Sequence, residues 1–232
     1  ANNHHRANLG DASPETGQNT TDQVFESLYS AILTLELVPG SKVSETEVAR
    51  SLGVSRQPVR DAFYRLSELG FLRIRPQRTT TITCISEVAL RDARFIRTAL
   101  EVECLHAAIK KRTDADIEGL EELLTAQKAA LSEGDRLRFH ALDDQFHRTI
   151  TEIAGHPGAW AVIRDQKVHL DRVRYLSLGF GAQSAFDDHR AILDCLIAGD
   201  AARAEARLRQ HLSTILEVLA QVRKAHSAYF ED

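Results

Sequence analysis

The chain has 232 residues, of which 43% are hydrophobic, and a formal net charge of −4. This composition predicts a globular protein with a core of its own, and the length allows two small domains. No apolar run approaches the roughly 20 residues that cross a bilayer, and no signal-peptide pattern opens the chain, so we expect no membrane partner.

The first 20 residues are polar and predict a flexible N-terminal tail. The cysteines, Cys84, Cys104 and Cys195, are widely separated, odd in number and form no C-x-x-C pair. Reduced thiols in a cytoplasmic protein are the interpretation that this pattern favours.

The charge is distributed unevenly along the chain. Residues 50–78 carry seven arginines against two acids, whereas residues 86–232 carry 20 basic against 24 acidic side chains. A basic segment on an otherwise acidic protein indicates a nucleic-acid-binding face joined to a domain of another kind.

Residues 21–85 predict helices followed by a hairpin. Apolar residues recur at helical spacing over 24–35, and "VPGSK" ends that pattern. Ser44 can cap a short helix that ends at Gly53, and Ser55 can cap the next, with Pro58 in its first turn. Two helices joined by a tight turn that contains glycine form a helix-turn-helix.

The second of these helices presents two different faces. Its apolar face predicts core residues, namely Val59, Ala62, Phe63 and Leu66. Its polar face carries Arg56, Gln57, Arg60 and Tyr64. Two arginines one turn apart suit insertion into a major groove, where they reach guanine edges or phosphates. The following "FLRIRPQRTTTITCI" predicts two short strands around residues 76–78, which form a wing.

The stretch "VPGSKVSETEVARSLGVSRQPVRDAFYRLSELGFLRIRPQR" resembles the winged helix of GntR-type bacterial transcription regulators. The resemblance covers about residues 24–85. It implies that Arg56 and Arg60 contact operator bases or nearby phosphates, with Gln57 beside them. It further implies that Arg50 and Arg65 contact the DNA backbone and that Gln77 and Arg78, at the wing tip, reach the minor groove.

Residues 86–232 predict only helices, so we expect a mainly α protein whose C-terminal domain is an all-α six-helix bundle. Breaks at glycine, aspartate and proline positions divide this region. The expected helices span about 86–111, 114–132, 135–154, 157–178, 184–198 and 200–230.

Three histidines and one aspartate lean toward the interior of this expected bundle. Asp143 and His147 lie four residues apart beside the apolar stripe of one helix, His189 lies on the apolar face of a second, and His211 on that of a third. Each histidine alone is more simply a satisfied core residue. The whole set favours a metal site, because buried imidazoles and carboxylates need partners. Zinc fits this ligand mixture best, with nickel or manganese as alternatives.

The same region resembles the ligand-binding FCD domain of the FadR-like branch of GntR regulators, in the stretches "FIRTALEVECLHAA", "LDDQFHRTI" and "DDHRAILDCLIAGDAARAEARLRQHL". Six helices resemble its shorter, VanR-like variant. The resemblance implies that Asp143, His147, His189 and His211 hold the ion. It also implies that Arg97 faces the effector, although an ion pair with Glu101 is an equal alternative. Weaker effector-binding candidates are Arg172, Arg174 and Tyr175.

These patterns predict a homodimeric repressor that a small carboxylic acid releases from double-stranded operator DNA. The acid would bind at the metal and change how the bundle supports the linker around Ser86. We expect no enzymatic activity. The alternatives are a metalloenzyme acting on a small carboxylic acid, a sensor for the metal ion itself, and a pocket for a larger effector such as an acyl-CoA.

Overall fold

The protein is described here by a computed structural model, which defines residues 20–75 and 79–231. The expected tail, apart from Thr20, and the wing tip with Gln77 and Arg78 lie outside these described residues. Within them, no helix is long and apolar enough to cross a membrane.

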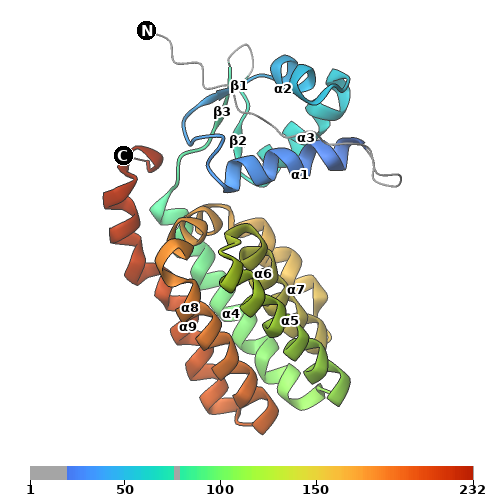
Figure 1. Cartoon of the computed structure of the whole chain (residues 1–232), viewed down its shortest axis with the longest axis vertical. Coiled ribbons are helices and arrows are strands. Elements are labelled where there is room, and N and C mark those ends of the chain that lie inside the picture. Colours follow the sequence, from blue (N-terminus) through green and yellow to red (C-terminus); the bar gives the residue numbers. More distant parts are fainter. Residues whose placement is uncertain (1–19, 76–78, 232) are drawn as a thin grey trace. The chain divides into compact units, whose positions relative to one another are not determined.

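The chain divides into two compact units (Figure 1). The N-terminal unit comprises the described residues from Thr20 to Ser86 together with those from His226 to Glu231. The helical unit is Glu87–Ala225.

The N-terminal unit is a winged helix-turn-helix, as predicted. Its helices are α1 (Thr20–Leu33), α2 (Glu45–Leu52) and α3 (Arg56–Glu68). Its strands are β1 (Lys42–Val43), β2 (Leu72–Arg73) and β3 (Thr80–Ile82), which form an antiparallel sheet in the order β1-β3-β2. The core lies between α1, α3 and the sheet, and α3 contributes the buried residues Val59, Ala62, Phe63 and Leu66.

The turn between α2 and α3 depends on Gly53. Its φ of 65° lies in the left-handed region, which glycine adopts at little cost, and its N–H closes the end of α2. Ser44 and Ser55 do stand at the N-cap positions with extended backbones, but neither side chain makes a capping hydrogen bond.

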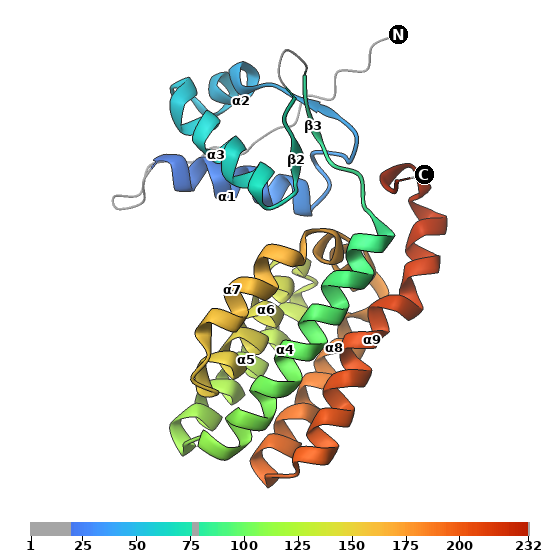
Figure 2. The same cartoon turned by 180° about the vertical axis from the view of Figure 1, so that it is seen from behind.

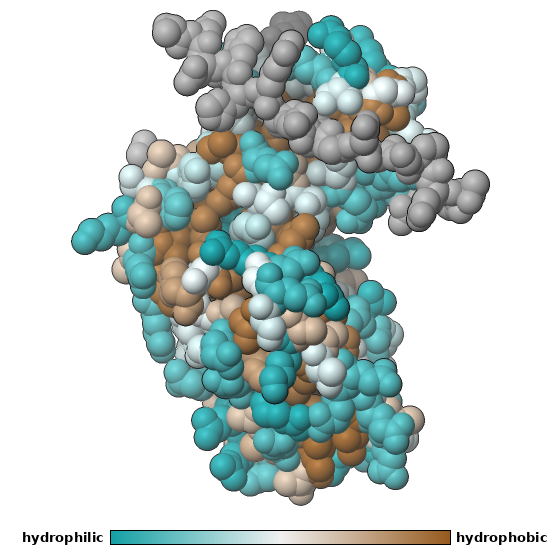
Figure 3. All heavy atoms as spheres, in the orientation of Figure 1, coloured by the Kyte–Doolittle hydropathy of each residue, from teal (hydrophilic) through white to brown (hydrophobic). Residues whose placement is uncertain are grey.

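The helical unit is a bundle of six helices (Figure 2), in agreement with the expected all-α fold. They are α4 (Glu87–Lys111), α5 (Asp114–Glu133), α6 (Arg136–Ile153), α7 (Pro157–Gln166), α8 (Val168–Ala198) and α9 (Ala201–Ala225). Helix α4 packs against α6, α8 and α9, and α5 packs against α6 and α8. Hydrophilic side chains cover much of the face of this unit drawn in Figure 3, as expected for helices that bury their apolar stripes.

Three of the predicted helix limits are wrong. Helix α7 ends at Gln166 rather than near residue 178, because the chain breaks at Lys167. Helix α8 then continues through Gly179 and Gly181, where we expected a break. Helix α9 ends at Ala225 rather than 230, and the residues after it join the N-terminal unit.

Candidate metal centre

Four side chains from three helices converge inside the helical unit. Asp143 and His147 lie one turn apart on α6, and they meet His189 from α8 and His211 from α9. Their potential ligand atoms all lie within 4.8 Å of one another. The structure therefore brings together all four residues that the sequence singled out as metal ligands.

The imidazole Nε2 atoms form the centre of this group. Nε2 of His211 lies 3.2 Å from Nε2 of His189 and 3.3 Å from Nε2 of His147. A carboxylate oxygen of Asp143 lies 3.5 Å from Nε2 of His189, and its other oxygen lies 3.9 Å from Nε2 of His147. Three imidazoles and one carboxylate thus face a common point, which is the donor set of a zinc or related transition-metal site.

The opposite nitrogen, Nδ1, of each histidine faces an acceptor. Nδ1 of His189 donates a 2.8 Å hydrogen bond to Oε1 of Gln127, whose amide nitrogen is fixed by the carbonyl of Leu142 at 3.1 Å. Nδ1 of His211 lies 3.1 Å from a carboxylate oxygen of Asp188. The third acceptor is Glu101 on α4, whose Oε2 lies 2.6 Å from Nδ1 of His147.

These acceptors determine which nitrogen of each ring carries the proton. A proton on Nδ1 leaves a lone pair on Nε2, so three lone pairs point at one another. Such an arrangement is repulsive by itself and becomes favourable around a cation. Acceptors behind the imidazoles are the usual outer partners of metal-bound histidines.

Burial keeps these imidazoles neutral. It lowers the pKa of His147 and takes that of His189 well below its ordinary value. The pKa of His211 falls to about 4, again because of burial and despite the opposing effect of Asp188. Neutral imidazoles can bind a metal without first losing a proton.

Arg97 forms a buried ion pair with Glu101, which is the alternative that sequence analysis left open for it. Its Nε contacts Oε1 of Glu101, and both side chains are only 3% exposed. Burial opposes the charge on Glu101, but Arg97 and His147 together hold the pKa of this carboxyl well below its usual range. Nη2 of Arg97 is buried and has no hydrogen-bond partner among the described residues.

Arg174 on α8 lies directly beside the cluster. Its Nη2 contacts the carboxylate of Asp143, and its Nη1 lies 3.1 Å from an oxygen of Asp144 and 3.4 Å from one of Asp171. Arg172 is fully buried and contacts Nδ1 of His169 at 3.1 Å, on the same helix. Tyr175, the third of the weaker effector candidates, is half-buried.

A second group of possible ligands, His140, Asp144 and Asp171, has a different character. The ammonium of Lys167 lies 2.7–2.9 Å from both oxygens of both aspartates. Burial opposes ionisation of Asp171, but Lys167 lowers its pKa to about 2. This group already contains its own cation, so we do not assign a metal to it.

The position of Arg174 implies a bend in α8. His189 follows it by about four turns, roughly 22 Å along a straight helix, yet both side chains reach Asp143. The axis must therefore turn between them, where Gly179 and Gly181 lie. The two glycines do not end the helix, which continues to Ala198.

The residues that sequence analysis missed are the outer partners of the cluster. Glu101, Gln127 and Asp188 hold the imidazoles, and Lys167 and Asp171 hold the neighbouring group. Only Glu101 had been noticed, as a helical partner of Arg97.

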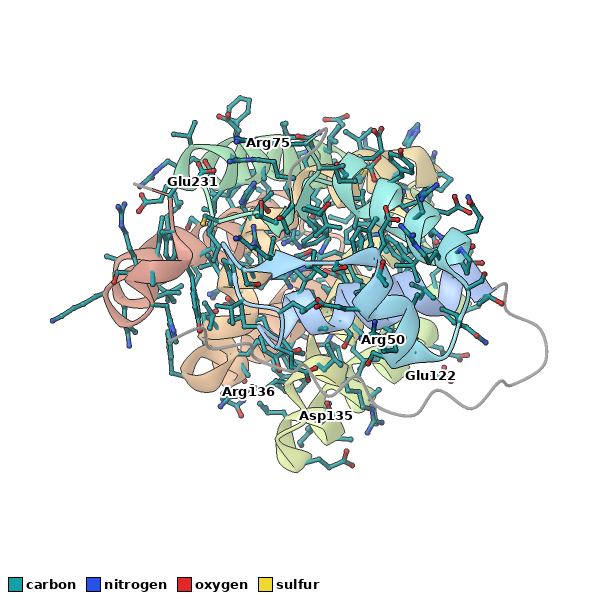
Figure 4. The ribbon with its side chains drawn as sticks, turned by 90° about the horizontal axis from the view of Figure 1, so that it is seen from above. Arg50, Arg75, Glu122, Asp135, Arg136 and Glu231 are labelled. Atoms are coloured by element: carbon teal, nitrogen blue, oxygen red, sulfur yellow. The ribbon has the colours of Figure 1, made fainter. Side chains whose placement is uncertain are left out.

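The arginines expected to bind DNA lie on the N-terminal unit. Arg56 and Arg60 extend from α3 with side chains 60% and 45% exposed, at 3.5 and 3.4 Å from the same oxygen of Glu45. Gln57 is exposed and donates to Asp61 at 2.9 Å. Arg50, labelled in Figure 4, is an exposed residue of α2.

Arg65 has a structural role that sequence analysis did not foresee. Its guanidinium lies 2.7 Å from Asp22 and 4.1 Å from the ring centroid of Phe25, both on α1. These contacts join α3 to α1, so a role in DNA backbone contact would come in addition to them.

Comparisons with known proteins agree with this architecture. Residues 20–82 match the model of the family described as "Bacterial regulatory proteins, gntR family", and residues 92–214 match the FCD domain. The chain is 35% identical over 217 residues to the HTH-type transcriptional repressor RspR of Escherichia coli (strain K12), covering 93% of this chain and 95% of that protein. It is 31% identical over 210 residues to the probable D-xylose utilization operon transcriptional repressor of Paenarthrobacter nicotinovorans, covering 88% and 91%.

Among solved structures, E. coli McbR/YncC has the same fold, with a TM-score of 0.76 at 22% identity over 88% of this chain and 99% of that one. A putative transcriptional regulator GntR from Rhodococcus sp. RHA1 gives a TM-score of 0.69, also at 22% identity, and covers 88% and 98%.

Proposed function

Because this chain belongs to the GntR family of bacterial regulatory proteins and carries an FCD domain, it is a transcriptional regulator, and we propose that it is a repressor controlled by a small carboxylic acid bound at a metal in its helical unit. The metalloenzyme alternative finds no support, since both family matches and the named relatives are regulators.

The observation that carries the proposal is the convergence of three Nε2 atoms whose rings are fixed from behind by Glu101, Gln127 and Asp188. Asp143, His147, His189 and His211 would hold a divalent transition metal, zinc first. When bound, the metal supplies a Lewis-acid position for an oxygen ligand.

The charges around the centre come to balance when a divalent ion is added. Three cations lie in or beside the cluster against five carboxylates, and the two charges of the ion make up the difference. The cations are Arg97, Lys167 and Arg174, and the carboxylates are Glu101, Asp143, Asp144, Asp171 and Asp188. We infer an anionic effector from two of these guanidiniums instead.

Arg97 and Arg174 are the side chains that we propose for the effector carboxylate. Arg97 has a buried donor without a partner in the described part of the chain, and Arg174 touches both Asp143 and the neighbouring aspartates. An acid with a hydroxyl beside its carboxylate would present two oxygens to the metal while keeping its charge near these guanidiniums.

The test begins with metal analysis of the purified chain, followed by a thermal-shift screen of sugar acids, hydroxy acids and aromatic acids. A binding acid raises the melting temperature by mass action. Arg174→Ala should reduce that shift while the metal content stays the same. A chain that purifies without metal and binds none added would refute the proposal.

Operator binding is the second part of the function. GntR regulators bind operator DNA through the N-terminal unit, and we propose that a homodimer presents two such units to an imperfect palindrome. An operator duplex can be selected from a random pool by the full chain. Its affinity should fall when the active acid is added, and light scattering of the free protein should give the mass of a dimer.

A sensor for the metal itself remains the second candidate. An ion held by four protein ligands can be the regulatory signal, or it can have a purely structural role. Titrating zinc against operator affinity, with and without the acid, distinguishes the two. A response to zinc that the acid does not alter favours the sensor, whereas a loss of affinity when acid is added at saturating zinc favours the acid-controlled repressor.

A further inference from the structure

The chain crosses between the two units twice. The first crossing runs from Ser86 into α4 at Glu87, and the second from α9 at Ala225 into His226. Residues 226–231, here named the C-terminal strap, belong to the N-terminal unit although they follow the last helix of the other. A helix that carries a candidate metal ligand, His211, therefore continues directly into the DNA-binding unit.

The strap is anchored on the residue before the first crossing. Ile85 donates its N–H to the carbonyl of Tyr229 at 2.7 Å and accepts from the N–H of Glu231 at 2.9 Å. Ile85 and Phe230 form a parallel β-bridge, and both side chains are buried, at 0% and 6% exposure. Two main-chain hydrogen bonds and a buried aromatic ring therefore fix the strap on Ile85.

The strap also organises itself locally. Residues Ser227–Tyr229 form a 3-10 turn, and the rings of His226 and Tyr229 stack with centroids 5.3 Å apart. The exposed Arg73 of β2 lies 3.8 Å from Glu231, a contact that adds little free energy. The anchoring thus rests on Ile85 and Phe230.

On the helical side of the crossings, the same two chain segments are joined again. Arg223, in the last turn of α9, forms an ion pair with Glu87, the first residue of α4. The two connections are therefore tied together on both sides, by Arg223 and Glu87 in one unit and by Phe230 and Ile85 in the other. Ile85, the residue that the strap contacts, lies three residues after β3.

We propose that the C-terminal strap transmits the state of the candidate metal centre from α9 to the winged helix. This inference rests on the proposed function, because it requires that binding at His211 changes α9. Because contacts join the two connections within each unit, a shift at the end of α9 would act on the strap and on the segment at Ile85 together. Through the strap, a movement of the C-terminal end of α9 would alter the sheet of the N-terminal unit.

The test compares the full chain with a chain that ends at Ala225 and with Phe230→Ala, which keeps the strap but removes its anchor. Ser227→Ala, at an exposed strap position, is the matched control. Each protein is stripped with EDTA, then loaded with zinc, and its zinc content is measured. Hydrogen exchange of the Ile85 and Glu231 amides and affinity for the selected operator duplex are recorded before and after loading.

In the full chain and in Ser227→Ala, zinc should change exchange at both amides and change operator affinity by about fivefold or more. The two strap variants should bind the same amount of zinc, yet their operator affinity should change by less than about twofold. Thermal unfolding establishes that each variant is folded before it is compared.

The outcomes separate the two ideas. If the full chain binds no zinc, the proposed function fails. If it binds zinc fully but the two amides do not respond, or if the strap variants respond as the full chain does, the metal site stands and the strap inference is overturned.

Discussion

Replacing Glu101 by glutamine removes one negative charge from a buried ion pair of the helical unit. Glu101 and Arg97 are each 3% exposed, and Glu101 also faces His147. The amide that replaces the carboxylate keeps its size, so packing changes little. Arg97, however, becomes a buried charge without a counter-ion.

The magnitude follows from that burial. Removing one partner of a buried pair costs about 3–5 kcal/mol, because the remaining charge stays desolvated. For a domain of this size, each kcal/mol lowers the melting temperature by about 3 °C, so Glu101→Gln should melt about 10–15 °C below the wild type.

The chain contains a matched control. Arg148 and Glu152 have the same residue types, order and i,i+4 spacing on α6, but their side chains are 52% and 40% exposed. Glu152→Gln should cost at most about 0.5 kcal/mol. Both variants are compared by thermal and urea unfolding in EDTA, so that metal binding does not contribute.

A double variant identifies the cause. In Arg97→Met with Glu101→Gln, no unpaired charge remains, and most of the lost stability should return. Equal losses for Glu101→Gln and Glu152→Gln, or a double variant no more stable than Glu101→Gln, would refute the buried-charge argument.

Three further predictions concern the metal, the pH and the operator. His189→Ala should lower zinc content and effector response but spare operator binding by the metal-free protein, whereas His106→Ala, outside the cluster, should leave zinc content unchanged; equal zinc in both would remove His189 from the site. Since burial lowers the folded-state pKa of His211 to about 4, the unfolded chain takes up the proton first as the pH falls below its ordinary value near 6.5. The metal-free protein should therefore lose stability between about pH 6.5 and 4, by about 2 kcal/mol at pH 5 from this residue alone; urea midpoints that stay constant over this range would contradict it. Arg56→Ala or Arg60→Ala should weaken operator binding by about 1–3 kcal/mol, measured by fluorescence anisotropy, and unchanged affinity in both would defeat the docking model.

Sequence alone predicted the fold well where periodicity and turn residues agree. The winged helix was predicted from the order of its elements, with Gly53 in the turn and a basic hairpin after the second helix of the motif. The cluster was predicted from the positions of His189 and His211 on apolar stripes. An inward-facing polar residue is visible in sequence because it interrupts an apolar stripe.

The outer partners could not be predicted in the same way. Gln127 and Asp188 meet the histidines across helix contacts, and nothing in their local spacing specifies a distant partner. Their roles depend on how α5, α8 and α9 pack, which one sequence does not encode as a short-range pattern.

The errors around α7 and α8 have a related origin. Gly179 and Gly181 were taken to end a helix, but a bundle can keep helical hydrogen bonds through glycines and bend instead. The actual break at Lys167 carries no glycine or proline. There the buried ammonium of Lys167 is held between Asp144 and Asp171, a tertiary contact that overrides local preference.

The shared contact of Arg56 and Arg60 with Glu45 affects how this regulator should respond to ionic strength. Both guanidiniums are partly neutralised by Glu45, so docking through them, as proposed, would exchange one anionic partner for another. Fewer condensed cations would then be released per arginine than the number of basic side chains suggests, and we expect the affinity to fall less steeply with added salt. Glu45 would thereby weaken attachment to arbitrary DNA and leave relatively more of the discrimination to base contacts.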